Sequence, residues 1–441
     1  MNNPSPGLPA NGRADSVARG TLTNLVTRLL GVAAVLVITT LTARLGTEVQ
    51  GAFALFTGVE GVLLALFSGL GIALARRVSH HQESPRALTT AVIATGLLLG
   101  VVASLLLWAA SKALPPAYAP LWMLALAAPF LLLAPNLSGL WLGEGRMGPM
   151  ALLTLSPTLL ALALIGVLWA LQQAGLLAVL AAWVSAKVVV SLLLLAALWR
   201  SGRLAPIAAP AVAALKVELP FIARIGVTNL ISLLNYRVGL FVVERVLGLA
   251  ATGVYSLAVV VAELLWFVSS SLTQAVYGRI GTPDRAAAAA TTVRAVQLSL
   301  TALLLATPLL WLVAGWLLPR LLGPAYADSL LPMALLLPGV LVFGGASALS
   351  AYFTNHAGLP QVPARVAALS LVLNATLCVL LVPRLGMAGA AASASLSYAA
   401  SVALLAWRFV RHAGLPLAAL LRPGPQLWAD VRSVLALAGV R

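Results

Sequence analysis

Six ionisable residues stand inside long apolar stretches of the sequence: Arg28, Glu60, Lys187, Arg224, Arg237 and Glu263. A charge at the centre of a lipid bilayer costs roughly 3 kcal/mol on insertion scales, so such a residue indicates a functional site or a buried ion pair. Four of the six are cations and two are acids. This excess of cations predicts a site that prefers an anionic ligand.

Asn24 and Arg28 belong to a polar stripe on the first apolar stretch. At 100° per residue they share one helix face with Thr21, Gly31 and Thr39. A polar face on an apolar helix indicates contact with water or ligand, and hydrogen bonding to neighbouring helices is the alternative. We predict that Asn24 and Arg28 bind the ligand.

A second polar face contains Arg224 and Asn235, with Thr228 and Ser232 between them. Arg237 lies off this face, near the expected helix end at 243, where a long cation can extend towards the membrane surface. We predict ligand contacts for Arg224, Asn235 and Arg237.

Lys187 stands in the middle of an apolar stretch, with Trp183 one turn before it and Ser191 one turn after it. Such a position suits a bundle interior or a cavity. We predict that Lys187 contacts the ligand, and the alternative is a structural ion pair with Glu60 or Glu263.

Glu60 and Glu263 occupy nearly equivalent places in the two halves of the chain. An acid inside a membrane helix can exchange a proton or bind Na⁺ during a transport cycle, so both are predicted to couple an ion. The alternative is a fixed ion pair with one of three intramembrane cations: Arg28, Lys187 or Arg224.

The stretches that carry these residues have the composition of membrane-spanning helices. Of the 441 residues, 61% are hydrophobic and 9% charged, against about a quarter charged in soluble domains. Crossing a bilayer takes about 20 apolar residues. The predicted fold is an all-α polytopic membrane protein with about twelve spans, near 20–43, 51–74, 87–110, 118–142, 150–171, 176–199, 219–243, 250–277, 292–318, 328–353, 363–383 and 386–410.

The spans form two predicted six-helix bundles between tails. We predict a cytoplasmic N-terminal tail, an N-terminal bundle, a cytoplasmic linker, a C-terminal bundle and a cytoplasmic C-terminal tail, over 1–19, 20–199, 200–218, 219–410 and 411–441. Eighteen Lys and Arg residues fall on the side of the tails and five on the other. Because cytoplasmic loops are rich in Lys and Arg, both termini are predicted to be cytoplasmic, in a bacterial inner membrane.

Two short motifs repeat between the halves. Leu45-Gly46 followed by Gly51 recurs as Leu247-Gly248 followed by Gly253, and a Pro-Ala-Tyr-Ala segment begins at both 116 and 324. Each half has an even number of spans, so the bundles are predicted to be related by a pseudo-two-fold axis along the membrane normal.

These glycine motifs, with the run Pro383-Arg-Leu-Gly-Met-Ala-Gly389, resemble the polysaccharide transporter branch of the multidrug/oligosaccharidyl-lipid/polysaccharide exporter superfamily. The resemblance covers about residues 20–410. Thr27-Arg28-Leu-Leu-Gly31 is also similar to the first-helix motif of lipid II flippases, which implies that Arg28 faces a central cavity. Ala34 and Val35 depart from that group, which typically has an Arg-Asp pair there.

The resemblance implies a flippase that moves a polyprenyl-diphosphate-linked oligosaccharide, such as an O-antigen or exopolysaccharide unit, to the periplasmic leaflet by alternating access. The implied partners are membrane lipids, the lipid-linked glycan and polysaccharide polymerase or assembly proteins. A multidrug or cation antiporter of the same superfamily and a lipid II flippase are alternatives. A membrane glycosyltransferase or polymerase is a further one, disfavoured because the outer-loop acids Glu48, Glu244 and Asp328 stand alone.

Cofactor patterns are absent from the sequence. The four histidines lack ligand spacing, the single Cys378 allows no internal disulfide, and no nucleotide-binding glycine motif is present. The 27 Lys and Arg residues, which leave a net charge of +16, are scattered singly and do not indicate nucleic acid. We expect a non-enzymatic carrier without a cofactor, driven by a proton or Na⁺ gradient.

Overall fold

The computed structural model describes residues 17–80 and 85–422, and every regular element in these ranges is helical. The predicted all-α fold is therefore confirmed. Most of the two predicted tails lies outside the described residues. Within those residues, eleven segments are long and apolar enough to cross a membrane, so the chain is a multi-pass membrane protein.

One of the eleven segments is too long for a single crossing. Ala209–Gln274 has 66 residues, which would make a helix of about 100 Å against a hydrocarbon core of about 30 Å. Its helix α9 (Ala209–Glu263) contains Gly248 in a left-handed conformation, with φ 83°. Gly248 turns the chain between two helical arms, and counting two crossings here gives the predicted twelve.

The described chain forms two compact units. The first consists of the described residues up to Leu45 together with Phe56–Leu230, and the second of Gly46–Leu55 together with the described residues from Ile231 onward. Helix α2 (Thr47–Phe67) and α9 each contribute to both. The predicted boundaries at 200 and 219 differ from this division, because α9 begins at Ala209 and is continuous through both units.

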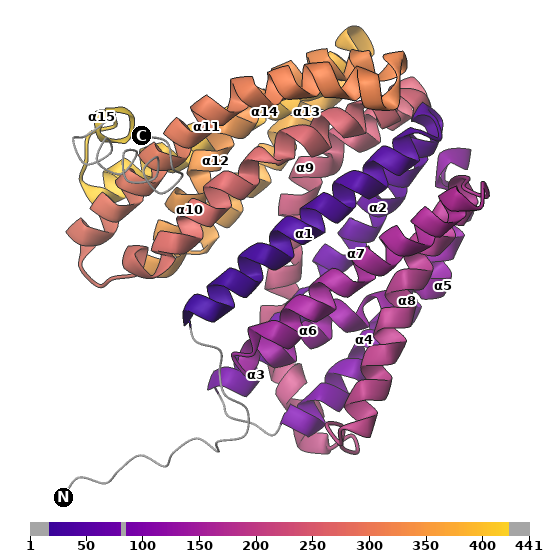
Figure 1. Cartoon of the computed structure of the whole chain (residues 1–441). Coiled ribbons are helices and arrows are strands. Elements are labelled where there is room, and N and C mark those ends of the chain that lie inside the picture. The colour runs from indigo at the N-terminus through magenta and orange to yellow at the C-terminus, as the bar shows by residue number, and fades with distance from the viewer. Residues whose placement is uncertain (1–16, 81–84, 423–441) are drawn as a thin grey trace, which may run out of the picture. The chain divides into compact units, whose positions relative to one another are not determined.

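The first unit packs its helices in adjacent pairs, α3 with α6, α4 with α5, α7 with α8 and α1 with α7. Figure 1 shows α7 and α8 side by side. Besides parts of α2 and α9, its elements are α1 (Val17–Ala43), α3 (Gly69–His80), α4 (Pro85–Ala113), η1 (Pro116–Tyr118), α5 (Leu121–Leu131), α6 (Leu133–Gly143), α7 (Met147–Ala170) and α8 (Leu176–Arg200).

The second unit is built around α14, which packs on both α12 and α13. Helix α11 packs on α10 and α12, and a short π-helical turn ends α12. Its elements beyond α9 are α10 (Leu265–Ile280), α11 (Arg285–Leu322), η2 (Pro324–Ser329), α12 (Leu330–Ala351), η3 (Tyr352–His356), α13 (Gln361–Leu385), α14 (Met387–Ala413) and α15 (Ala418–Leu421).

The sequence repeats correspond to repeated local structure. Gly46 and Gly248 both have positive φ, 125° and 83°, at the turn after the first helix of each half, and both Pro-Ala-Tyr segments form 3₁₀ turns. Gly51 and Gly253 meet in the second unit. A methyl group on either one would overlap a backbone carbonyl of the other helix, so two helices cross there with backbones in direct contact.

Two predicted spans are interrupted. The span predicted at 51–74 breaks at Ser68 between α2 and α3, and the one predicted at 118–142 breaks at Leu132 between α5 and α6. Asn136 connects the two breaks, because its Oδ1 accepts a hydrogen bond of 3.0 Å from the N–H of Gly71 in the first turn of α3. That N–H has no partner within its own helix, so Asn136 fixes α3 against α6.

The linker predicted at 200–218 is helical in its second half. Pro210 is compatible with a helix start, because the first N–H groups of a helix need no intrahelical acceptor. The polar Glu218 accepts bonds from Arg76 (3.2 Å) and Arg77 (3.0 Å) of α3. The polar residues that predicted a loop here instead belong to a helix, and Glu218 among them forms an ion-pair cluster with α3.

Candidate functional site

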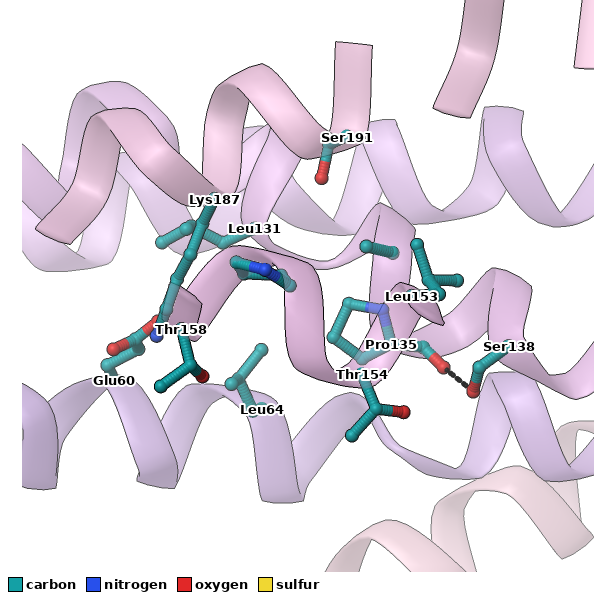
Figure 2. Close-up of a pocket in the computed structure, with 12 residues that line it drawn as sticks. Glu60, Leu64, Leu131, Pro135, Ser138, Leu153, Thr154, Thr158, Lys187 and Ser191 are labelled. Carbon is teal, nitrogen blue, oxygen red and sulfur yellow. Dashed lines mark hydrogen bonds and ion pairs between the residues drawn. The ribbon is translucent and has the colours of Figure 1, made fainter. Parts of the chain in front are cut away.

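Helices α2, α5, α6, α7 and α8 of the first unit line a pocket of about 300 Å³. Its lining includes Glu60 from α2, Ser138 from α6, Thr154 and Thr158 from α7, and Lys187 from α8. Figure 2 shows Glu60 and Lys187 at one end of the pocket and Ser138 at the other. Among the described residues that line this pocket, Glu60 and Lys187 are the ionisable ones.

Glu60 is held by two donors from α8. The Lys187 ammonium forms an ion pair with its Oε1, and Trp183 Nε1 donates to its Oε2 at 2.7 Å. The same ammonium lies 4.1 Å from the centroid of the Trp183 ring, within the range of a cation–π contact. The side chain of Glu60 is 3% exposed and that of Lys187 18%, so the ammonium is the more accessible member of the pair.

The second unit contains an ion pair of different geometry. Arg237 Nη1 and Nη2 bind Glu263 Oε1 and Oε2 at 3.1 and 3.2 Å, the bidentate arrangement that a planar guanidinium favours. The side chains are 28% and 20% exposed. Both residues belong to α9, on opposite sides of the Gly248 turn, so the turn brings the two helical arms together.

Four aromatic rings form a cluster beside this pair. Tyr236, next to Arg237, has its ring centroid 4.8 Å from that of Trp266, which follows Glu263 by three residues. Phe343 and Tyr398 complete the cluster, 4.9 Å apart. Trp266 Nε1 is buried, with no hydrogen-bond partner among the described residues.

Asn235 lies in the interior of the second unit. It is 2% exposed, its Nδ2 donates to Ser370 Oγ at 3.2 Å, and its backbone carbonyl accepts from Asn374 Nδ2 at 2.8 Å. These bonds tie α9 to α13. Arg224 is exposed in the first unit, so the polar face predicted for these two residues is not uniformly accessible.

The first-helix residues are only partly described. Arg28 is exposed on α1. Asn24 lies in the same helix, but its side chain is outside the described part of the structure. The ligand-binding roles of Arg28, Asn24, Arg224 and Asn235 therefore stay predictions.

Arg237 lies farther from a helix end than expected. Its helical arm continues to the Gly248 turn rather than ending near 243, and its side chain binds Glu263. For Glu60, the structure selects Lys187 among the three expected partners. For Glu263 the partner is Arg237, which was not among them. The repeated Leu-Gly turn is the signal that could have identified this pair, because a helical hairpin juxtaposes residues on both sides of its turn.

No family model matches the sequence, and no curated protein is similar to it. Among solved structures, an inward-facing multidrug resistance MATE family transporter of the MOP superfamily matches with a TM-score of 0.69 at 17% identity, over 93% of this chain and 96% of that one. The lipid II flippase MurJ, in an inward closed conformation, matches with a TM-score of 0.69 at 13% identity, over 92% and 89%. The fold is that of the MOP superfamily transporters.

A third match comes from Pyrococcus furiosus. It is a MOP superfamily transporter for which a reverse polarity of the binding pocket suggests a different function, and it matches with a TM-score of 0.63 at 17% identity, over 93% of this chain and 98% of that one. Since all these identities are 17% or lower, the matches establish the fold alone. Both drug transporters and a flippase share it, so the fold does not single out the polysaccharide branch.

Proposed function

We propose that this protein is a flippase that moves a polyprenyl-diphosphate-linked oligosaccharide, an O-antigen or exopolysaccharide unit, across the bacterial inner membrane by alternating access. The observation that carries the proposal is the state of the two intramembrane acids. Glu60 is paired with Lys187 and Glu263 with Arg237, each within its own unit. A carrier of cationic drugs needs an acid that is available to its cargo, whereas both acids here already have a cation.

The charge balance inside the helices favours an anionic cargo. The four intramembrane cations exceed the two acids by two. Helix α9 extends beyond the predicted spans and so adds two cations and two acids: Lys216, Glu218, Glu244 and Arg245. The excess of two cations over acids is therefore unchanged. Arginine suits a diphosphate because its planar donors bind phosphate oxygens in pairs. Arg28 and Arg224 are the proposed diphosphate ligands.

Lipid II transport is the second candidate. The similarity to MurJ in fold and the Thr27-Arg28 motif favour it. Lipid II also carries a polyprenyl diphosphate, so the two candidates share the recognition chemistry and differ in the glycan. Cargo competition between the two glycans separates them.

The experiment uses purified protein in proteoliposomes. A fluorescent polyprenyl-diphosphate glycan and the lipophilic cation tetraphenylphosphonium are offered separately, and export of each is measured. We expect translocation of the diphosphate alone. Arg28→Ala and Arg224→Ala should each reduce it, while Arg365→Ala, at another exposed arginine, serves as the matched control. Transport of tetraphenylphosphonium without the diphosphate would instead establish a cation carrier.

The direction of transport depends on the proposed orientation, with both termini in the cytoplasm. A reporter fused after residue 205, between α8 and α9, should report cytoplasm, and one fused after residue 326, in η2, should report periplasm. The reverse pattern would invert the proposed topology.

A further inference from the structure

The first unit has a strongly basic end, where α3, α6 and α8 finish and α4, α7 and α9 begin. We propose that arginines at this basic end bind the phosphate headgroup of an anionic phospholipid. The inference goes beyond the proposed function, because the lipid is a ligand of the protein surface and not its cargo.

Charge is unevenly distributed between the two ends of the unit. Among the described residues, the basic end carries seven cations and two acids: Arg76, Arg77, Arg86, Arg146, Arg200, Arg203, Lys216, Glu144 and Glu218. The opposite end carries Arg44 and Lys112. The sequence predicts the basic end to be cytoplasmic, and the cytoplasmic leaflet of a membrane has a negative surface potential. Anionic lipid is therefore the anion that this end would meet at the highest concentration.

The first ion-pair cluster of the basic end joins α3 to α9. Glu218 accepts hydrogen bonds from Arg76 at 3.2 Å and from Arg77 at 3.0 Å. The Arg76 guanidinium also lies 4.9 Å from the centroid of the Phe221 ring, a cation–π distance that orients it. The side chain of Glu218 is 5% exposed and that of Arg76 44%. One acid with two cations leaves a net positive charge, and Arg76 presents it to the surroundings.

The second cluster has the same composition on other elements. Arg203, between α8 and α9, donates from Nη1 to both oxygens of Glu144 at 2.9 and 3.1 Å. Arg146, just before α7, has its Nη1 3.5 Å from Glu144 Oε2. Both arginine side chains are about one third exposed. A guanidinium has five N–H donors, so these contacts leave donors that a phosphate oxygen can bind.

Both clusters lie on one packed platform. Gly143, next to Glu144, approaches α3 so closely that a methyl group on it would lie 2.8 Å from the carbonyl oxygen of Ala75, and Arg76 is the next residue of α3. Below them, one hydrophobic core contains side chains of α3, α6, α8 and α9. The arginines are therefore held in place before a ligand arrives, which lowers the cost of ordering them on binding.

Exposed apolar side chains border the clusters. Val217 and Leu219, on either side of Glu218, are exposed, and so is Leu142, two residues before Glu144. A soluble phosphate can use only the cations at such a place, whereas a phospholipid can bind the arginines with its phosphate and cover the apolar side chains with its acyl chains. The combination of arginines and apolar surface favours a lipid over a free anion.

The test is native mass spectrometry of the full-length protein in detergent, titrated separately with dioleoyl phosphatidylglycerol and dioleoyl phosphatidylcholine. The two lipids have the same chains and one phosphate each, but only phosphatidylglycerol has a net negative charge. We expect tighter binding of phosphatidylglycerol, with a preference that falls as salt rises, because salt screens exposed charges. Glycerol 3-phosphate, which has no acyl chains, should not displace it.

Two variants remove the arginine with the longer contact in each cluster. Arg76→Gln and Arg146→Gln each leave the acid bound to the other arginine, so the ion pair that joins the elements is kept. Each should weaken phosphatidylglycerol binding about fivefold and leave phosphatidylcholine binding unchanged, and the double variant should lose most of the preference. Arg365→Gln, at an exposed arginine of the second unit, is the matched control. Circular dichroism and melting temperature verify that each variant is folded.

Three results would overturn the inference. The first is equal affinity of the wild type for the two lipids, or a preference that survives in the double variant. The second is displacement of phosphatidylglycerol by glycerol 3-phosphate, which would make this a site for soluble phosphate. The third is a parallel loss of both lipids in the variants, which would assign the arginines a structural role. None of them bears on the cargo, which the proteoliposome assay tests.

Discussion

The two units hold equivalent acids with different partners. Glu60 in the first unit is paired with a lysine that lines a pocket of about 300 Å³. Glu263 in the second unit is paired bidentately with an arginine beside a cluster of four aromatic rings. A point charge on a flexible stem exchanges partners more readily than a planar fork with two bonds. The comparison suggests that the first unit contains an adaptable pair and the second a structural one.

The difference arises from the position of the cation in the chain. Arg237 precedes the Gly248 turn and Glu263 follows it, so the helical hairpin itself aligns them. The corresponding position before the Gly46 turn is occupied by Ala34 and Val35. That position offers Glu60 no cation, and Glu60 is paired with Lys187 of α8. The two halves therefore share the acid and the Leu-Gly turn, but the cation that pairs with the acid differs. It is Lys187 of α8 in the first unit and Arg237 of α9 in the second.

The largest effect is expected when the pair of the second unit is broken. Arg237→Met leaves the Glu263 carboxylate beside aromatic rings, and removing one partner of a buried ion pair costs about 3–5 kcal/mol. The melting temperature of the purified protein should fall strongly. The double variant Arg237→Met, Glu263→Leu should recover most of the loss, because it removes both charges. A single variant that melts like the wild type would show that Glu263 is solvated and the pair dispensable.

Breaking the pair of the first unit should cost less, about 2 kcal/mol for Lys187→Met. Glu60 keeps the bond from Trp183, and a pocket of this size, lined by polar as well as apolar side chains, has room for water that can solvate the carboxylate. The same melting experiment measures the loss. If Lys187→Met is as destabilising as Arg237→Met, the pocket does not solvate Glu60 and the contrast between the units disappears.

The fold was more predictable than these contacts. Apolar runs of about 20 residues determined the all-α class and the number of crossings, because a bilayer imposes both. The Leu-Gly repeats located the turns at Gly46 and Gly248. Helix breaks inside spans were missed, since the break at Ser68 depends on Asn136 from a distant helix.

Site residues were recognised by type but not by partner. The cost of an intramembrane charge identified Glu60, Lys187, Arg237 and Glu263 as notable. The Lys187 and Glu60 pair was one of several alternatives, because spacing alone does not show which helices are neighbours. Trp183 was noted only as one turn from Lys187, and its bond to Glu60 depends on α2 and α8 packing together.

The two tryptophans near these pairs give a third test of the contrast. Trp183→Phe removes a hydrogen bond to a carboxylate and should cost about 1.5 kcal/mol. Trp266→Phe removes a buried N–H that has no partner among the described residues, so it should be close to neutral or slightly stabilising. Thermal melts of both variants measure the difference, and equal losses would mean that the Trp183 bond contributes nothing beyond packing.

The smallest effects should come from exchanging the cation types, and they address the contrast most directly. Arg237→Lys keeps the charge but loses one of the two bonds to Glu263, so we expect a loss of about 1 kcal/mol. Lys187→Arg keeps the charge and can direct two parallel N–H groups at the carboxylate, and the adjoining pocket accommodates the larger head group, so its loss should stay below about 0.5 kcal/mol. Melting temperatures of the two variants, each compared with wild type in the same detergent, measure both losses. If Lys187→Arg is the more damaging exchange, the pocket is not available to the side chain of residue 187, and neither water nor a phosphate group could approach the ammonium from that side.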